Sequence, residues 1–343
     1  MSTRARTKSD DIYARLAQAV EKRRRLFFGT GTDVFRLVHG STDAFPGLVI
    51  DAYAAIARIE IYDDSWLVHL EEIANCLRGL WPYPACIVGI QRKSRGKITK
   101  IPLLGHAPAG HVAREEGLRF WVRSAEADAA GAGLFADHRE GRRLVRNAAA
   151  GKPVLNLFAH AGGFGVAAVA GGASRVDHVD AAKKCAGWAA LNLALNGENP
   201  RRHRFMVEDA FKILKRAARK GPQYGVIVCD PPTTAIRPGG KRFVSRDYLP
   251  EMSRQACEAL LEGGALLLST NDRSLPVTSI LEAAQEGAAL AGRKALRVIE
   301  IQRGPDIPFS DREHENPMRG VWMILDRCDE ANGSVPTLPV TTA

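Results

Sequence analysis

The sequence lacks the features that mark secreted, membrane-spanning and metal-binding chains. No eighteen apolar residues run together, and the first residues, MSTRARTKSDD, contain no apolar segment, so neither a membrane span nor a secretion signal is expected. No C-x-x-C pair occurs, which argues against a disulfide framework and a zinc site and favours reduced thiols in the cytoplasm. The six cysteines are scattered along the chain: Cys76, Cys86, Cys185, Cys229, Cys257 and Cys328.

Acidic residues are in deficit. The chain has 38 Asp and Glu against 48 Lys and Arg, a formal net charge of +10 and a pI near 9.5. This excess predicts a polyanionic partner, and nucleic acid is favoured over a membrane because no basic amphipathic anchor is present. A merely soluble basic protein is the alternative.

Cations concentrate in two stretches. Residues 22–25, KRRR, lie near the end of a helix expected over 11–28, where they suit the helix dipole or contact RNA phosphates. Residues 91–100, QRKSRGKITK, leave a strand edge and form either a solvated loop or a phosphate-binding loop. The loop contributes the predicted RNA-binding residues Arg92, Lys93, Arg95 and Lys97.

The periodicity of apolar residues predicts two domains. Residues 1–34 are expected to form a basic helix and linker, and strand-like runs around Phe45-Pro46-Gly47 begin a small α/β domain over 35–115. Strand and helix patterns then alternate over 116–327, which predicts a parallel sheet covered on both faces. The last two strands of this larger domain are expected to form an antiparallel hairpin at one edge. Residues 328–343 are small and polar, and disorder is expected there.

A glycine cluster follows the first strand of the larger domain. The apolar run of PVLNLF, residues 153–158, is too short for a buried helix, and glycines at 162, 163 and 165 precede residues at helical spacing. This pattern predicts a strand, a tight turn and a helix, with a backbone that a ligand can approach closely. The spacing is not G-x-G-x-x-G and no Lys-Ser/Thr pair follows, which disfavours a bound pyrophosphate.

Asp180 closes the second strand of this domain. A carboxylate at that point can accept both hydroxyls of a ribose, so a nucleoside-containing ligand is expected, and S-adenosylmethionine fits that description. An ordinary strand-to-helix turn remains the alternative reading of the glycines alone.

Polar residues follow five successive strands of the larger domain. Because ligands bind at the carboxyl ends of parallel strands, these residues predict a binding site, although any one of them could be a helix cap. They are Asn156, Asp180, Asp209, Asp230 and Asn271. In this arrangement Asp209 would accept from an adenine amino group.

Two short segments add to the predicted site. Asp230-Pro231-Pro232 forms a stiff loop whose carbonyls are free to accept from a ligand, unless the prolines are only structural. Asp137 and Arg139 precede an amphipathic helix, and they could hold the ammonium and carboxylate of an amino acid, although Asp137 could be a cap.

Six segments, LFADHREGRR, VLNLFAHAGGFG, HVD, LALNG, VCDPPT and LSTNDRS, resemble the large-subunit (23S) ribosomal RNA methyltransferases of the class I S-adenosylmethionine-dependent superfamily. They are similar to the cytosine-C5 branch and to the guanine-N7 domain of the bifunctional K/L enzyme. FRLVHGSTDAFPGLVIDAY resembles the small central domain of these proteins, so the resemblance covers residues from about 15 to 327.

The resemblance implies a Rossmann-like α/β fold with a seven-stranded sheet, S-adenosylmethionine as cofactor and ribosomal RNA as partner. It places Asp180 at the ribose, Asp209 at the adenine and Asp230 between cofactor and reacting base. The other implied cofactor residues are Asp137, Arg139, Asn156, Phe158, Ala161 and Gly162, and the implied catalytic residues are Asp230, Pro231 and Pro232, which line the methyl-transfer site. Asn271 is added as a catalytic residue because, together with Asp230, it could bind the edge of a guanine.

Two departures from the cytosine branch bear on the chemistry. Too few residues precede the central domain for the N-terminal PUA domain of that branch. Methylation at cytosine C5 also needs a thiolate, which the branch carries in a Ser-Cys-Ser after the fifth strand. Here that position reads Ser269-Thr270-Asn271, close to the Ser-Asn-Asn of the N7 domain, and the other possible thiol position holds Thr233. Cys229 precedes Asp230, and strand alternation predicts that it faces away from the site.

The sequence therefore predicts a cytoplasmic methyltransferase that acts without a covalent intermediate on guanine N7 of 23S ribosomal RNA. Guanine N7 is already nucleophilic and loses no proton, so positioning supplies most of the catalysis. Pro305-Asp306-Ile307-Pro308 is nearer the cytosine branch, which keeps a cytosine-C5 enzyme as an alternative. A methyltransferase for a small molecule or protein is another, and an RNA-binding module with a decayed site is disfavoured. Neither a metal nor a membrane is expected as a partner, and the oligomeric state is not indicated.

Overall fold

A computed structural model describes residues 8–80, 85–92, 98–106, 109–123, 131–236, 242–272, 274–310 and 318–327. The described residues form two compact units. The first combines residues from 1–137 with residues from 303–316, and the second combines 138–302 with 317–343. These limits differ from the expected boundary at 115 and 116, because two segments expected in the larger domain pack within the first unit.

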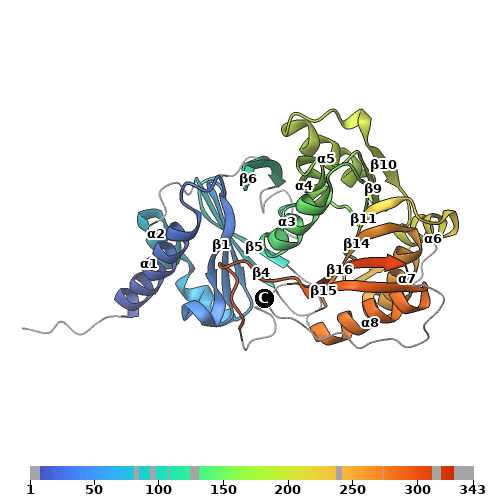
Figure 1. Ribbon diagram of the computed structural model, residues 1–343. Coiled ribbons are helices and arrows are strands. Elements are labelled where there is room, and N and C mark those ends of the chain that lie inside the picture. The colour runs from blue at the N-terminus through green and yellow to red at the C-terminus, as the bar shows by residue number, and fades with distance from the viewer. Residues whose placement is uncertain are drawn as a thin grey trace, which may run out of the picture. The chain divides into compact units, whose positions relative to one another are not determined.

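The first unit is built on a five-stranded sheet in the order β1-β2-β3-β4-β5 (Figure 1). Only β3 and β4 are parallel. The strands are β1 (Val34–His39), β2 (Leu48–Tyr53), β3 (Ile56–Ile61), β4 (Cys86–Arg92) and β5 (Ile98–Leu104), and the helices are α1 (Lys8–Phe27), η1 (Gly40–Asp43), η2 (Asp64–His69) and α2 (Leu70–Leu80). Ile12, Leu16 and Val20 line one face of α1 and are buried in the same core as the sheet, as their spacing predicts. Of the basic stretch expected as a loop over 91–100, residues 91–92 belong to β4 and residues 98–100 to β5, and residues 93–97 lie outside the described residues.

Two contacts explain why the first unit extends past residue 115. β6 (Gly110–Glu115) and β7 (Leu118–Arg123) form an antiparallel hairpin, and His111 Nε2 lies 2.8 Å from the carbonyl oxygen of Tyr53. The buried hydroxyl of Tyr53 donates to the carbonyl of Leu134 at 3.1 Å. Both interactions attach residues beyond 109 to β2.

The cationic run on α1 has a structural role that the sequence did not predict. Arg23 is fully buried, and its guanidinium donates to both carboxylate oxygens of Asp43 at 2.8 and 2.6 Å. It also donates to the carbonyl oxygens of Arg36 at 3.1 Å and Asp306 at 3.2 Å. The carboxylate of Asp306 in turn accepts from the backbone N–H of Arg36 at 2.8 Å. These bonds tie the described residues 303–310 to the first unit, and they leave Arg23 unable to reach RNA.

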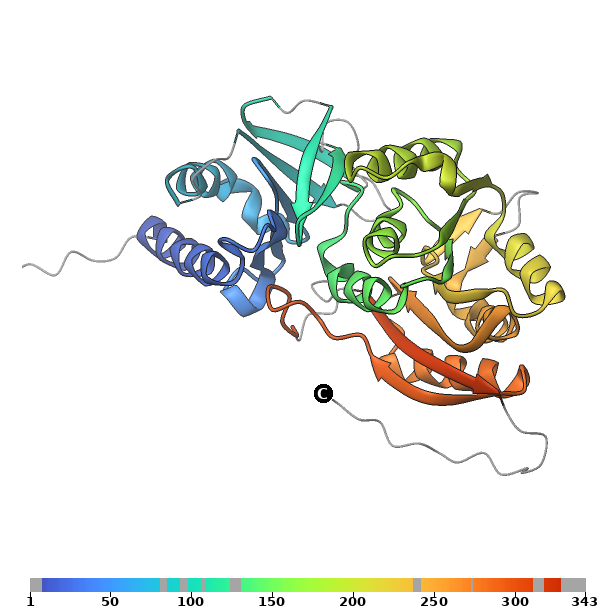
Figure 2. The ribbon, with the colours of Figure 1, turned by 45° about the horizontal axis from the view of Figure 1, so that its top comes forward.

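The second unit contains a seven-stranded sheet in the order β10-β9-β8-β11-β14-β16-β15. The strands are β8 (Pro153–Leu157), β9 (Arg175–Asp180), β10 (Arg204–Val207), β11 (Tyr224–Cys229), β14 (Leu260–Thr270), β15 (Arg293–Glu300) and β16 (Arg319–Arg327). The five strands from β10 to β14 are parallel, and β16 pairs antiparallel with both β14 and β15. Figure 2 shows β15 and β16 as the long orange and red arrows. This arrangement confirms the expected Rossmann-like sheet with its antiparallel edge.

Helices cover both faces of this sheet. They are α3 (Arg139–Ala148), α4 (Gly163–Ala170), α5 (Lys183–Leu195), α6 (Ala210–Lys220), α7 (Leu249–Ala259) and α8 (Val277–Leu290), with short turns η4 (Ala136–His138), η5 (Pro200–Arg202) and η6 (Ser245–Tyr248). Residues of α3 and α4 share one core with the β8 residue Val154, whereas residues of α6, α7 and α8 share another with its neighbour Leu155. Alternating strand residues therefore serve opposite layers. A hairpin of β12 (Thr234–Ile236) and β13 (Arg242–Val244), not expected from the sequence, follows β11.

In the part of the chain that the structure describes, no helix is both long and apolar enough to cross a membrane. The same residues include no cluster of three or more His, Cys, Asp or Glu side chains able to hold a metal ion.

Candidate active site

Asp180 is the last residue of β9, and its carboxylate is fixed by the backbone. Oδ2 accepts from the N–H of His160 at 2.9 Å, and Oδ1 accepts from the N–H of Ala182 at 2.9 Å. Each carboxylate oxygen has a second lone pair, so this geometry leaves acceptor capacity at the carboxyl edge of the sheet. The predicted ribose acceptor is therefore preorganised between the turns that follow β8 and β9.

The turn after β8 is strained in a way typical of ligand-binding loops. Phe158 has φ 55° and His160 has φ 47°, both in the left-handed region that residues with a Cβ seldom adopt. The carbonyl of Ala161 accepts from the buried amide of Asn192 at 2.8 Å, which fixes the turn to α5. The ring of Phe158 meets that of Phe211 edge to face, with centroids 5.9 Å apart.

Close packing within the protein requires glycine at positions 162 and 165, where the sequence suggested that glycines let a ligand approach the backbone. Gly162 has φ 79°, and a Cβ there would lie 2.7 Å from the Cβ of Ala189. A Cβ at Gly165 would lie 2.0 Å from Cε1 of His178. The glycine cluster therefore allows the turn to pack closely on α5 and β9, in addition to any contact with a ligand.

Asn156 lies inside the sheet layer, one residue before the end of β8. It is buried, and its Nδ2 lies 3.4 Å from Nδ1 of His178 on the neighbouring strand. Among the described residues, Asn156 Oδ1 and His178 Nε2 have no hydrogen-bond partner. Burial, with a smaller effect from His203, lowers the pKa of His178 to about 3, so its ring is neutral at physiological pH. Asn156 thus differs from the expected strand-tip position, because its place in the strand turns the side chain toward His178.

Asp209 caps a helix, which was the alternative role considered for the polar residues that follow the strands. It is the N-cap of α6, and its Oδ1 accepts from the N–H of Phe211 at 2.9 Å. The cap fixes the side chain at the end of β10, beside the Asp180 turn. Adenine recognition by Asp209 stays a prediction.

Asp230 follows β11 and lies between two side chains from distant segments. Ser269, near the end of β14, donates its hydroxyl to Oδ1 at 2.6 Å. Nε2 of His138 lies 3.5 Å from Oδ2, and the imidazole is buried edge-on against the ring of Phe164. The Asp230 side chain keeps 17% exposure, so it is held in place yet open to solvent.

His138 and Ser269 had no role predicted from the sequence. The signal for His138 was its place between Asp137 and Arg139, and the signal for Ser269 was its place at the end of a strand. No local pattern relates either residue to Asp230, which lies 39 residues before Ser269. Their convergence follows from the pairing of β11 with β14 and from the position of α3.

The other predicted catalytic residues have different exposures. Pro231 is buried, whereas Pro232 and Asn271 are exposed at the same edge of the sheet. The following residue, Asp272, is buried and forms an ion pair with Arg246 at 2.6 Å. This pair fixes the turn after β14 and leaves the Asn271 side chain outside the core.

The predicted pair of Asp137 and Arg139 falls in different units. Asp137 is in the first unit, where it contributes to the raised pKa of Arg36. Burial acts to lower that pKa, and the Coulomb interaction with Asp51 and, more weakly, with Asp137 outweighs it. Arg139 is the first residue of α3 in the second unit and is 3% exposed. Their contact with the methionine end of a cofactor stays a prediction.

Three thiols of the second unit, Cys185, Cys229 and Cys257, lie within the described residues and are buried. Cys229 is buried in the core shared with α7 and α8, and burial, then Cys257 and Asp230, raise its thiol pKa. The predicted orientation of Cys229 is therefore confirmed. Cys185 lines a cavity of about 10 Å³ beside Asp180 and His178, at β9, which β8 separates from β11.

Of the four predicted RNA-binding residues, only Arg92 lies within the described residues. Its Nε donates to Oε2 of Glu60 at 2.6 Å, so its charge is matched inside the first unit. The remaining three, Lys93, Arg95 and Lys97, lie outside the described residues.

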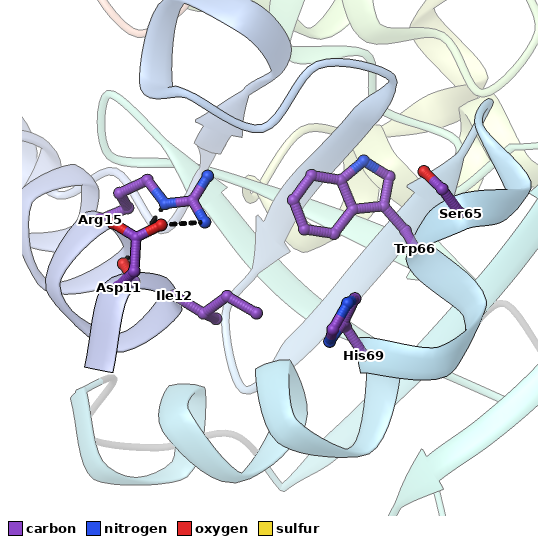
Figure 3. Close-up of a pocket in the computed structure, with 6 residues that line it drawn as sticks. All are labelled: Asp11, Ile12, Arg15, Ser65, Trp66 and His69. Atoms are coloured by element: carbon purple, nitrogen blue, oxygen red, sulfur yellow. Dashed lines mark hydrogen bonds and ion pairs between the residues drawn. The ribbon is translucent and has the colours of Figure 1, made fainter. Parts of the chain in front are cut away.

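A hollow of about 260 Å³ lies between α1 and η2 in the first unit (Figure 3). Trp66 and His69 line it from η2, and Asp11, Ile12 and Arg15 line it from α1. Arg15 is paired with Asp11 at 2.8 Å and donates to the carbonyl of Ala44 at 2.6 Å. The indole N–H of Trp66 donates to the carbonyl of Pro46 at 2.8 Å. The guanidinium and the indole N–H are therefore already bonded within the unit, and the hollow contains none of the predicted site residues.

Three comparisons relate the chain to known proteins. A family model described as S-adenosylmethionine-dependent methyltransferase matches residues 88–313. The chain is 30% identical over 334 residues to the ribosomal RNA large subunit methyltransferase of Deinococcus radiodurans, covering 93% of this chain and 81% of that protein. It is also 30% identical to ribosomal RNA large subunit methyltransferase I of Aeromonas salmonicida, covering 88% and 76%. The resemblance drawn from the motifs is thereby confirmed.

Solved structures agree with this result. A methyltransferase crystallised with SAH superposes with a TM-score of 0.82 at 25% identity, covering 94% of this chain and 83% of the other. A SAM-dependent methyltransferase from Streptococcus mutans gives 0.80 at 25% identity, with the same coverage. The expected class I fold is confirmed by these neighbours.

Proposed function

Because the chain belongs to the S-adenosylmethionine-dependent methyltransferase family, we propose that it methylates a base of large-subunit ribosomal RNA in the cytoplasm, with guanine N7 as the acceptor. The printed names of the relatives and the net charge of +10 support RNA as the substrate class. The observation that carries the choice of acceptor is the fixed carboxylate of Asp230, next to a cysteine, Cys229, whose side chain is buried in the core.

The residues at the carboxyl edge fit S-adenosylmethionine, the methyl donor of the family. The backbone-anchored carboxylate of Asp180 suits two ribose hydroxyls, because its oxygens retain acceptor capacity. The turn of Phe158 to Gly162 would lie along the cofactor, and Asp209 would accept from the adenine. When bound, the sulfonium supplies an activated methyl group, so the protein needs to add position and charge.

Asp230 suits an acceptor that becomes positively charged. Methylation of guanine N7 removes no proton and leaves the ring cationic, so no base is required and a fixed negative charge stabilises the product-like state. Ser269 and His138 would hold that carboxylate in one orientation. Asn271, exposed at the same edge, would bind the guanine edge.

The segment that kept the cytosine alternative open has a structural role in the first unit. Asp306, in the Pro305-Asp306-Ile307-Pro308 segment, is buried in the first unit and is bonded to Arg36 and Arg23. Its position is explained by these structural bonds. The segment therefore does not distinguish the two acceptors.

Mass spectrometry of nucleosides from ribosomal RNA of cells with and without the gene tests the proposal. Loss of 7-methylguanosine, restored by the wild-type gene, is expected. Loss of 5-methylcytidine instead would show that the acceptor is cytosine C5 and not guanine N7. An unchanged ribosomal RNA together with a methylated protein or small molecule would reject RNA as the substrate.

Replacing Asp180 with alanine is expected to weaken S-adenosylmethionine binding by about 10- to 100-fold, because two charge-assisted hydrogen bonds to the ribose would be lost. Isothermal calorimetry measures this effect. Glu262→Ala is the control, because Glu262 is exposed near the start of β14, at the end of the strands opposite Asp180, and should leave the affinity within about twofold. Equal affinities for wild type and Asp180→Ala would remove Asp180 from the cofactor site.

Replacing Cys229 with alanine is expected to leave the rate of methyl transfer within about twofold of wild type. The thiol is buried in the core between the sheet and helices α6, α7 and α8, and cannot reach the RNA base. Transfer of a tritiated methyl group to ribosomal RNA measures the rate. Cys257→Ala, in the same core, controls for packing effects. Complete loss of transfer in Cys229→Ala alone, with normal cofactor binding, would support a covalent mechanism.

A further inference from the structure

We propose that the exposed face of α6 binds the phosphate backbone of the RNA substrate. We define the α6 basic face as Lys212, Lys215, Arg216, Arg219 and Lys220. The inference deepens the proposed function, because it depends on RNA being the substrate.

The helix separates its cations from its apolar residues. At 100° per residue, the five cations fall within an arc of about 140°. The opposite face carries Ile213, Leu214 and Ala217, which are buried in the core beneath the sheet. The sequence AFKILKRAARK contains no acidic residue. The helix therefore presents a uniformly positive surface to solvent.

Most of this charge is not matched by the protein. Lys212 lies 3.6 Å from Glu208, and the charge of Lys215 contributes weakly to the lowered pKa of Glu251, whose main cause is the hydrogen bond from Arg254. For Arg216, Arg219 and Lys220, no carboxylate lies within 4 Å in the described residues. These three exposed cations supply the strongest attraction on the face for a polyanion.

Several exposed and half-buried arginines elsewhere in the described residues are paired with carboxylates. Arg254 on the neighbouring α7 is bonded to both Glu251 and Glu258. Arg246 is paired with Asp272, and Arg25 on α1 is paired with Glu21 at 3.0 Å. Arg78, Arg201 and Arg297 are also exposed without a carboxylate partner among the described residues, but each is isolated, whereas α6 gathers three such cations on one helix face.

The helix dipole accounts for only part of this pattern. Arg219 and Lys220 lie in the last turn, where cations stabilise a helix. Lys215 and Arg216 lie in the middle, where the dipole has little effect. Solvation of an exposed helix face is compatible with any polar residue there, whereas a polyanionic partner accounts for the single sign of the charge across the whole face.

The position of α6 links this face to the candidate active site. Asp209 caps the helix, and Phe211 in its first turn packs against Phe158 of the turn after β8. The helix has 11 residues and so is about 16 Å long. RNA bound along it would therefore have phosphates within about 20 Å of the strand ends. Contacts of this kind position the substrate without reading its sequence.

The test compares two variants with the same change in charge. Arg216→Ala/Arg219→Ala removes two cations from the α6 basic face, and alanine preserves the helix. Lys294→Ala/Arg297→Ala removes two exposed cations from β15, at the opposite edge of the sheet. Filter binding to an in vitro transcript of 23S ribosomal RNA is measured at several potassium chloride concentrations. Calorimetry with S-adenosylmethionine checks that each variant retains the folded cofactor site.

We expect the α6 variant to bind the transcript about tenfold more weakly near 0.1 M salt. The slope of log affinity against log salt should become shallower by about 1.5, since each lost phosphate contact removes about 0.7 to 0.9. The β15 variant should remain within about twofold of wild type.

An unchanged slope in the α6 variant, or an equal loss in the β15 variant, overturns this inference while leaving the proposed function intact. Wild-type protein that binds S-adenosylmethionine but not the transcript overturns both. Binding to anionic phosphatidylserine vesicles that is lost in the α6 variant, with RNA binding unchanged, would assign the face to a membrane surface and also overturn the inference.

Discussion

Replacing Asp230 with asparagine is expected to lower kcat for RNA methylation by about 100- to 1000-fold. The substitution keeps the size of the side chain but removes the negative charge that would stabilise a cationic guanine ring. Ser269 can still donate to the remaining carbonyl oxygen, so the loop should keep its position. Single-turnover methyl transfer to ribosomal RNA, with saturating S-adenosylmethionine, measures the chemical step.

Two neighbouring variants separate charge from position. Ser269→Ala and His138→Gln keep the carboxylate charge but loosen its orientation, and each is expected to cost about tenfold in kcat. S-adenosylmethionine affinity should stay within about threefold in all three variants. If Asp230→Asn retained half of the wild-type kcat, Asp230 would have no electrostatic role in the reaction.

Replacing Arg23 with methionine is expected to destabilise the first unit by about 3 to 5 kcal/mol. The change removes four hydrogen bonds and leaves the carboxylate of Asp43, which is 6% exposed, without its ion-pair partner. For a unit of this size the melting temperature should fall by about 10 °C. Thermal unfolding followed by circular dichroism at several scan rates measures the shift.

Arg25→Met provides the matched control, two residues along the same helix. Its side chain is 79% exposed and pairs with Glu21 on the surface, so the expected loss is below about 1 kcal/mol. The two variants remove the same charge from the same cationic run. Equal effects would show that the Arg23–Asp43 pair contributes no more than a surface pair.

Local patterns predicted most of the second unit. The strand predicted within 153–158 corresponds to β8 and the helix predicted after the glycines corresponds to α4, because both patterns depend on neighbouring residues. The β12–β13 hairpin was missed, since its three-residue strands are too short to show alternation. The membership of residues 303–310 in the first unit was also missed. It depends on Arg23 and Asp306, which are 283 residues apart.

The candidate site was predicted where a residue's place in the strand determined its role. Asp180 and Asp230 end up at the carboxyl edge because each closes a parallel strand. Asn156 differs, because a side chain one residue earlier is turned into the layer against His178. The partners of Asp230 could not be predicted, since a serine and a histidine from distant segments meet only after the sheet has formed. The burial of Arg23 in the cationic run on α1 could not be predicted for the same reason, because the carboxylate that it pairs with, Asp43, lies in another element.

The return of residues 303–310 to the first unit constrains the order of events during translation. The second unit through β15 is inserted between the two parts of the first. A ribosome adding about 5 to 20 residues per second needs on the order of 10 to 30 seconds to synthesise that insertion. Throughout this delay the nascent first unit lacks Asp306, so the hydrogen bonds from Arg23 and from the backbone N–H of Arg36 to Asp306 cannot form. Because β16 follows Asp306 in the chain, the sheet of the second unit is also incomplete until this last part has been synthesised.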